Sequence, residues 1–561
     1  MKILVNARIY TMAGSTRPVA AMAWDNDRIA RLGTREELCA RFPDAALVDA
    51  RGNTVFPGFI DPHIHFLQGV LYRYALDCTP DKTPSLDALK AAVQLAGKGL
   101  ENGSWVVGQG YDPASFDGLR PPDRNDLDQA CPDNPVVLFH YSLHECVANS
   151  KALELAGIGP ESQNPPAGEI EKDRKGIPTG RLIETAMEKV HLLSQRFLFA
   201  HRREAVLETF SKAQSDLFAK GITRIGDPAV DGEMIEFYRE ADEKNQLHLP
   251  IILHFCSNRQ MLNLPWDIVE TPRLKQEELT PSQNLIPGPL KIFLDGANRA
   301  GIKVTPTAFI LTVFATLFRC IKQLSLDPLR VAGRSPATFG KDFRFHLGTL
   351  MADVPDGIRL AKKAVNMGFP LCFHAIGNEA VKQALDIIKA VRKDHPMDAP
   401  PRIEHAMILD QDLIDEIKAL DITIVTQPAL LSHMSKDNIP YMPGLCQMPF
   451  KSLVDKGIRL SGSSDWPVDS FDPLLAIHHA VTRETIGGYI LDPHEALSVE
   501  EAVNLYTSTA AHTLGCARDA GTLEPEKRAD FIVLDADPFM SDKEIKNINI
   551  LETWVAGEKV Y

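Results

Sequence analysis

Eight short apolar runs recur along this 561-residue chain, and helical segments separate them. Apolar strands that alternate with helices predict an α/β fold with a parallel sheet, because each crossover helix returns the chain to the same edge. Eight such units favour a closed (β/α)8 TIM barrel over an open sheet. The runs are residues 54–61, 222–227, 250–255, 290–295, 370–374, 401–405, 422–427 and 458–465.

Three of the runs follow a helical segment that ends in glycine. Gly221, Gly368 and Gly457 stand at the ends of LFAKG, AVNMG and LVDKG. Glycine takes the left-handed backbone that ends a helix without a steric penalty. We expect each of the three to end its helix and lead into the next strand.

Two segments of the barrel region are too long to be connecting loops. Residues from about 66 to 203 follow the first run, and residues from about 297 to 355 follow the fourth. Loops at the carboxyl ends of the strands build the active site in this architecture. We therefore expect both insertions to cover the site and to select the substrate.

Both ends of the chain alternate short apolar runs with turn residues, as in MKILVNARIYTM near the start and ADFIVLDADP near the end. This spacing predicts short β-strands on both sides of the barrel. We expect residues 1–56 and 516–561 to form one small discontinuous β-sandwich domain, beside a barrel domain of residues 57–515.

Charge and cysteine content narrow the classes of partner. The formal net charge of -14 argues against nucleic acid, because phosphate binding needs clustered lysine and arginine. The nine cysteines are scattered and form no C-x-x-C pair, and the chain starts without a secretory signal, so we expect reduced thiols and a cytoplasmic protein. The expected partner is a small-molecule substrate, and a homodimer is one candidate assembly.

The most apolar stretch, residues 309–318, reads FILTVFATLF and runs directly into Arg319. It is too short to cross a bilayer. We expect it to form a buried helix or a lid, and we expect no membrane partner.

A pair of histidines follows the first run. His63 and His65 are separated by one residue, so on a strand both imidazoles can point to the same side while Ile64 points away. Two neutral imidazoles on one side make half of a metal site. An isolated H-x-H is a weak signal, and its place at the end of a barrel strand gives it weight.

Further ligand types lie on later runs. His374 ends the fifth run, His405 the sixth and Asp465 the eighth, all where a barrel draws its active-site residues. Lys291 lies within the fourth run, where a buried charge needs a partner or a chemical change. The alternatives are core histidines with satisfied hydrogen bonds, an outward-facing Lys291 and an Asp465 that caps the next segment. Their common position favours one metal site.

The sequence around these residues resembles the metal-dependent amidohydrolase superfamily. PGFIDPHIH, KIFLDG, HAIGNEA, RIEHA, SGSSDWPV and GTLEPEKRADFIVLD are similar to the YtcJ-like group, amidohydrolase family 3, which includes N-substituted formamide deformylases. The resemblance spans nearly the whole chain. It implies a binuclear metal site with the ligands His63, His65, Lys291, His374, His405 and Asp465.

This ligand set implies hydrolysis by activated water. One or two divalent ions, with zinc as the first candidate, would supply hydroxide near neutral pH and polarise a carbonyl. A CO2-derived carbamate on Lys291 would bridge two ions, whereas a one-metal site would leave Lys291 uncarboxylated. Asp465 is expected as the catalytic general base and acid, passing a proton to the leaving amine. Asp61 and Glu404 are expected to orient the ligand imidazoles.

Four residues are weaker candidates for substrate contact: His144, Tyr111, Asn149 and Trp466. The segment HYSLHECVANSKALELAGI, which contains His144 and Asn149, is similar to one in the family. Aromatic and asparagine residues in long loops serve as often in packing and turns. The family usually has Asp where this chain has Asn378, so we expect the surroundings of His374 to differ.

The leading hypothesis is metal-dependent hydrolysis of a non-peptide carbon–nitrogen bond, in an amide such as an N-formyl or N-acyl amine. A second hypothesis keeps the metal site but makes the enzyme a cyclic amidase or a deaminase. A third, of another class, is a catalytically inactive barrel that serves as a scaffold, and the complete ligand set argues against it. Fold alone does not decide among them.

Overall fold

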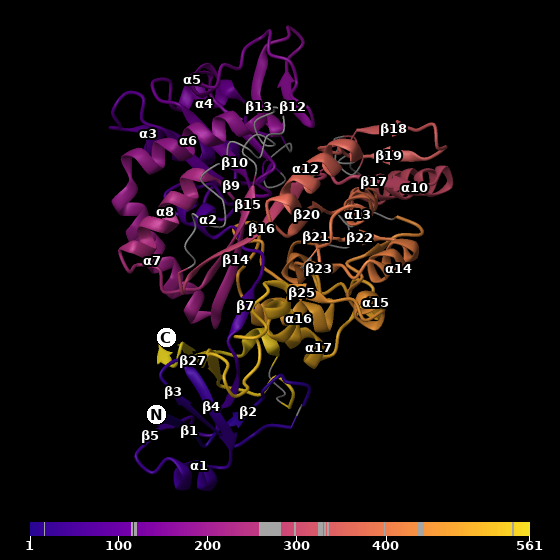
Figure 1. Cartoon of the computed structure of the whole chain (residues 1–561). Helices are drawn as coiled ribbons and strands as arrows, with labels where there is room; N and C mark the ends of the chain where they lie inside the picture. Colours follow the sequence, from indigo (N-terminus) through magenta and orange to yellow (C-terminus); the bar gives the residue numbers. More distant parts are fainter. Residues whose placement is uncertain are drawn as a thin grey trace.

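The computed structural model contains the expected barrel sheet (Figure 1). Eight strands lie in the order β25-β23-β21-β20-β16-β15-β14-β7, and all neighbouring pairs in this order are parallel. Each predicted run overlaps one of them, which confirms the α/β barrel. The strands are β7 (Phe59–Asp61), β14 (Ile222–Val230), β15 (Ile251–Cys256), β16 (Leu285–Phe293), β20 (Leu371–Ala375), β21 (Arg402–His405), β23 (Thr423–Thr426) and β25 (Leu460–Gly462).

The structure describes most of the chain. The described residues are 1–15, 17–113, 116, 120–256, 282–296, 299–323, 329, 333, 336–397, 399–434, 442–540 and 544–561.

The first predicted run covers two strands instead of one. Thr54–Pro57 form β6, which pairs with β26 (Phe531–Leu534) in a terminal sheet, and only Phe59–Asp61 belong to the barrel. Between them, a Cβ added at Gly58 would lie 2.2 Å from the side chain of Thr223, so the chain passes there only as glycine. The hydrophobic pattern could not reveal this change of sheet, because both strands are buried and apolar.

The first and last strands of this order, β25 and β7, are not paired with each other in a ladder of hydrogen bonds. Hydrogen bonds from neighbouring segments connect them instead. The N–H of Ile60 donates to the carbonyl of Tyr506 at 2.7 Å, from a turn that lies beside β7. Nearer the carboxyl ends, the N–H of Asp465 donates to the carbonyl of His63 at 2.9 Å. The sheet is therefore nearly closed, and closure brings the residues after the first and eighth strands together.

Helices cover the outside of the barrel and bury one apolar face each. In α13, for example, buried apolar residues recur three or four positions apart from Val381 to Val391. Gly221, Gly368 and Gly457 have φ angles of 74°, 84° and 68° directly after their helices, which confirms the predicted helix ends. The helices are α7 (Arg203–Ala219), α8 (Gly232–Glu243), α12 (Val354–Asn366), α13 (Asn378–Arg392), α14 (Gln411–Ala419), α15 (Phe450–Asp455), α16 (Pro473–Thr482), α17 (Val499–Asn504) and α18 (Ser508–Thr513).

The first insertion forms a six-stranded sheet of its own, in the order β12-β13-β11-β10-β9-β8. Figure 1 shows it at the opposite end of the molecule from the two termini. Its elements are α2 (Phe66–Tyr72), β8 (Leu76–Asp77), α3 (Leu86–Gly97), β9 (Val106–Tyr111), α4 (Arg124–Ala130), β10 (Val136–His140), β11 (Glu145–Ala148), α5 (Ser150–Leu155), β12 (Gly168–Lys172), β13 (Pro178–Glu184) and α6 (Glu188–His201).

The two ends of the chain form two sheets, β4-β3-β1-β5 and β2-β6-β26-β27-β28. They share a core in which the ring of Trp24 lies 5.5 Å from the rings of Phe531 and Trp554. The chain ends therefore pack on each other. The remaining strands of these sheets are β1 (Lys2–Val5), β2 (Arg8–Ile9), β3 (Ala21–Asp25), β4 (Arg28–Gly33), β5 (Ala46–Asp49), β27 (Ile550–Val555) and β28 (Glu558–Lys559), and α1 (Arg35–Arg41) packs beside them.

The second insertion holds a long helix, α10 (Pro306–Gln323), and a small sheet of β17 (Ile302–Val304), β18 (Ala337–Phe339) and β19 (Phe345–Leu347). The helix expected over residues 309–318 is present, but it is not buried, because Phe314 is 64% exposed and Phe318 is 68% exposed. Its alternative role as a lid stays a prediction. Only one face packs, with Phe309 stacked on Phe345 at 3.9 Å between ring centres. In the described part of the chain, no helix combines the length and apolar character needed to cross a membrane.

Candidate active site

Three side chains that can hold a metal ion meet where the first and eighth barrel strands end. The Nε2 atoms of His63 and His65, after β7, lie 3.2 and 3.3 Å from Oδ1 of Asp465, after β25. Their ligand atoms all lie within 4.8 Å of one another. Barrel closure thus places the H-x-H pair and Asp465 at one point.

The other three expected ligands surround this group. Nζ of Lys291, in β16, lies 3.3 Å from Nε2 of His63. The ring centre of His405, at the end of β21, lies 5.1 Å from that of His63 and 4.5 Å from that of His374, in β20. All six groups lie toward the carboxyl ends of their strands, where barrels build active sites.

This set of donors fits a divalent cation. Nε2 of His374 and Nε2 of His405 are buried and have no hydrogen-bond partner among the described residues. Burial lowers the pKa of His405 to about 3 and lowers the pKa of His374 well below its ordinary value, so both imidazoles are neutral. Neutral imidazoles and a carboxylate suit zinc and several other divalent ions. The six residues are therefore a candidate site for such an ion.

Glu404 orients His63. It contacts Nδ1 of His63, and it accepts hydrogen bonds from Arg402 at 2.6 Å to Oε1 and 2.9 Å to Oε2. Burial alone would raise the pKa of Glu404, but the Arg402 guanidinium and His63 outweigh it and hold this pKa well below its ordinary value. The carboxylate therefore stays charged, and it leaves Nε2 of His63 facing the metal ligands.

Asp61 acts on the backbone and not on an imidazole, which corrects its expected role. Its Oδ1 accepts the N–H groups of His63 and Ser464, both at 3.2 Å, and so ties together the ends of the first and eighth strands. The residue that orients His405 is Gln427, whose Oε1 lies 2.9 Å from Nδ1 of His405. Sequence reasoning missed Gln427, although it ends the seventh run.

Two residues tie the second insertion to the loop after His374. The carboxylate of Asp295 accepts the N–H of Gly301 at 2.9 Å, and its Oδ1 lies 3.5 Å from Nε2 of His374. Oδ1 of Asn378 accepts the N–H of Lys303 at 2.8 Å, and its Nδ2 donates to the Lys303 carbonyl at 2.9 Å. Asn378 thus serves as a link between segments, and Asp295 was not expected from the sequence.

Three residues of this site have a strained backbone. His405, Asp465 and Glu184 have φ angles of 75°, 57° and 51°, in a region that residues other than glycine rarely adopt. Each such residue costs about 1–3 kcal/mol and persists only where the surrounding structure enforces it. Two of the three are expected metal ligands.

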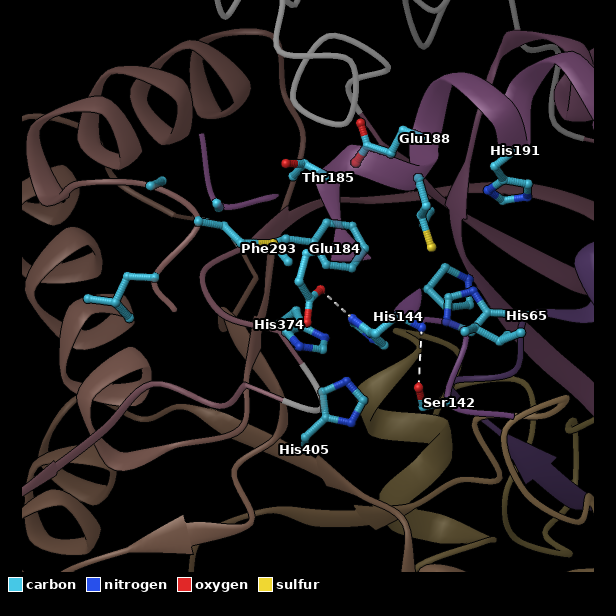
Figure 2. A pocket seen from close by; sticks show the side chains of 18 of the residues that line it. His65, Ser142, His144, Glu184, Thr185, Glu188, His191, Phe293, His374 and His405 are labelled. Atoms are coloured by element: carbon cyan, nitrogen blue, oxygen red, sulfur yellow. Dashed lines mark hydrogen bonds and ion pairs between the residues drawn. The ribbon is translucent and has the colours of Figure 1, made fainter. Parts of the chain in front are cut away.

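A cavity of about 940 Å³ opens beside the expected ligands (Figure 2). Its volume is at the upper end of the range for small-molecule sites. The barrel contributes His65, His374, His405 and Asp465 to its lining. Both insertions complete the wall, the first with His144, Glu184 and Glu188 among others, and the second with residues 350–354 and 356. The insertions therefore do shape the cavity.

His144 faces the cavity in a fixed orientation. Its Nδ1 lies 2.7 Å from Oε2 of Glu184, and its ring centre lies 5.9 Å from that of His374 (Figure 2). Burial would lower the pKa of His144, but the Glu184 carboxylate outweighs it and raises this pKa. Glu184 was not expected from the sequence, and its only signal is its place at the end of a strand.

The other three candidates for substrate contact do not line this cavity. Tyr111 is fully buried in the core of the first insertion. Asn149 caps α5 by accepting the N–H of Ala152 at 3.0 Å. Trp466 packs on α2, where a Cβ added at Gly69 would lie 1.9 Å from its ring. Their contacts are those of packing and capping residues.

Known proteins resemble this chain along almost its whole length. It is 30% identical to the N-substituted formamide deformylase of Arthrobacter pascens, over 99% of this chain and 97% of that protein. It is 26% identical to the putative amidohydrolase YtcJ of Bacillus subtilis (strain 168), over 99% and 98%.

The fold also has a counterpart among solved structures. An uncharacterized metal-dependent hydrolase from Pyrococcus horikoshii OT3 matches with a TM-score of 0.70 and 22% identity, over 97% of this chain and 99% of that chain. Residues 46–561 match the family described as the amidohydrolase family. The chain therefore belongs to the amidohydrolase family.

Proposed function

We propose that this protein, a metal-dependent hydrolase of carbon–nitrogen bonds, cleaves the amide bond of an N-formyl or N-acyl amine. The observation that carries the proposal is the meeting of six ligand-type side chains beside a cavity into which His144 projects. The similarity to a formamide deformylase supports the choice of an amide.

The ligands His63, His65, Lys291, His374, His405 and Asp465 would hold one or two divalent ions, with zinc as the first candidate. When bound, such an ion supplies activated water near neutral pH and polarises a carbonyl. Asp465, next to both His63 and His65, takes the proton of the attacking water and passes it to the leaving amine nitrogen. Nδ1 of His144 is held by Glu184, which leaves Nε2 for the cavity. The Glu184 carboxylate raises the pKa of His144 and so favours the imidazolium, whose Nε2–H donates to the negative charge that develops on the amide oxygen.

We also propose that Lys291 carries a carbamate. Its side chain is 1% exposed and forms no ion pair with a carboxylate in the described part of the chain. The ammonium would first release one proton to solvent, and the free amine would then add to CO2 and release a second, which converts a buried cation into an anionic metal ligand. A buried, unpaired ammonium is costly, and this step removes that cost. The setting we propose is the cytoplasm, where the nine cysteines stay reduced.

A substrate panel tests the proposed function. Metal-loaded protein is assayed for release of amine from N-formyl and N-acyl amines, for opening of cyclic ureas and for release of ammonia from aminopyrimidines. We expect amine release from the acyclic amides, and its loss in Asp465→Asn protein that retains its fold. Turnover of only cyclic ureas or aminopyrimidines would overturn the proposal in favour of a cyclic amidase or a deaminase. Tight metal binding without any turnover would favour the scaffold.

A further inference from the structure

We propose that Glu188 is a specificity-determining residue that binds a positively charged ammonium group at the far end of the substrate. The inference rests on the proposed function, because the same cavity would hold both the scissile amide and this group. Glu188 is the first residue of α6 and lines the cavity. Figure 2 shows it across the cavity from His405.

Glu188 is a buried acid that forms no ion pair within the described part of the chain. Its side chain is 6% exposed, and its Oε2 has no hydrogen-bond partner among the described residues. Burial raises the pKa of Glu188 to about 9. No lysine or arginine lines the cavity in the part of the chain that the structure describes. A cation brought in by the substrate would therefore remove the cost of burying this carboxylate unpaired.

Apart from the expected metal ligand Asp465, the other acidic residues that line the cavity already have partners. Glu184 is bonded to His144 at 2.7 Å. Asp353 accepts the N–H of Asp356 at 2.8 Å as the cap of α12, and Asp356 pairs with Arg359 at 2.9 Å. Within the described lining, Glu188 is thus the acid for which the protein supplies no partner.

Most of the remaining wall is apolar. Such a surface favours a hydrocarbon spacer between the scissile amide and the charged end, because burying methylene groups against apolar side chains is favourable. The geometry points to N-formyl or N-acyl derivatives of diamines as the substrate class. The apolar lining residues are Leu143, Met187, Met234, Phe293, Leu350, Met351 and Val354.

Matched substrates and an isosteric variant test this assignment. kcat/KM is measured for a series of N-formyl diamines of increasing chain length and for N-formyl alkylamines of equal length, which replace the ammonium with a methyl group. We expect the wild-type protein to prefer the diamine derivative by at least about tenfold at one chain length. Glu188→Gln should remove most of this preference and leave hydrolysis of the alkylamine derivative within about threefold of wild type. Glu154→Gln, the same change at an exposed position of α5, should behave as wild type.

A binding measurement separates failure of this inference from failure of the proposed function. Binding of the free diamine is measured by calorimetry, after thermal melting has shown that each variant is folded. If neither class of amide is hydrolysed but the diamine binds wild type at least about tenfold more tightly than Glu188→Gln, the cation site stands and the proposed function fails. If amides are hydrolysed with equal preference in both proteins, or the diamine binds both equally, the assignment of Glu188 is overturned.

Discussion

Two contacts join His144 to Glu184 above the expected metal ligands. Nδ1 of His144 lies 2.7 Å from Oε2 of Glu184, and the N–H of Glu184 donates to the carbonyl of His144 at 2.8 Å. Both residues come from the first insertion, and the nearest expected ligand ring is that of His374, at 5.9 Å between ring centres. The insertion thus supplies an imidazole of fixed orientation to a site whose expected metal ligands come from the barrel, and its Nε2 donates there when the ring is protonated.

This pair predicts a specific kinetic defect. In His144→Asn protein kcat should fall by a factor of about 100, because a donor to the developing oxyanion is lost. Glu184→Gln should have a smaller effect in the same direction, since the imidazole remains but is less well oriented. Steady-state kinetics and metal content are measured together. Loss of the metal, or an unchanged kcat, would contradict the role assigned to His144.

Glu404 links metal affinity to stability. Glu404→Gln should weaken metal binding by about 10–100-fold, because the partner that orients His63 loses its charge. The variant should also lose about 3 kcal/mol of unfolding free energy, since Arg402 becomes a buried charge without its partner. Competition with a chromogenic chelator gives the affinity, and urea unfolding of the metal-free protein gives the stability. Normal values of both would contradict the arrangement.

The acid at Glu188 makes stability depend on pH. Burial raises the pKa of Glu188 to about 9, from an ordinary value of 4.5. Between these values the folded protein keeps a proton that the unfolded chain has lost, so the free energy of unfolding falls as the pH rises.

Glu188→Gln removes this dependence. The variant should gain about 1–3 kcal/mol relative to wild type between mildly acidic and mildly alkaline solution. Urea unfolding of both proteins across this range measures the gain. Parallel stability curves would show that the carboxyl is not held protonated.

The exposed face of α10 should be insensitive to truncation. Phe318→Ser should change the free energy of unfolding by less than about 0.5 kcal/mol, because Phe318 is 68% exposed. Phe210→Ala, at a fully buried position of α7, should cost about 3–5 kcal/mol. Chemical unfolding of both variants makes the comparison. A large loss in Phe318→Ser would mean that this face is covered in solution.

The sequence predicts the barrel and the meeting of its ligands for one physical reason. Each strand is a short buried run with a polar residue at its end, and barrel closure brings those ends together whatever the intervening loops do. His374 and His405 therefore become neighbours although thirty residues separate them in the chain. Gln427 obeys the same rule, because it ends the seventh run and its side-chain amide contacts His405.

The site residues of the insertions could not be predicted in this way, because no regular spacing in the sequence indicates which of their side chains reach the cavity. Tyr111 and Asn149 resemble binding residues by type, but the sheet of the first insertion turns them into core and cap. Glu184 reaches the cavity through a strained turn, and no pattern in the neighbouring sequence predicts this turn. The large apolar residues of α10, such as Phe314, face outward, which composition alone could not show.

Metal removal and restoration tests the central claim most directly. The protein is stripped with a chelator, its metal content is measured by mass spectrometry, and amine release from an N-formyl amine is followed as zinc is added back. We predict that activity disappears with the metal and returns as one or two ions bind per chain, and that His405→Asn protein fails to recover. Full activity in metal-free protein, or no tight binding of any divalent ion, would contradict the account.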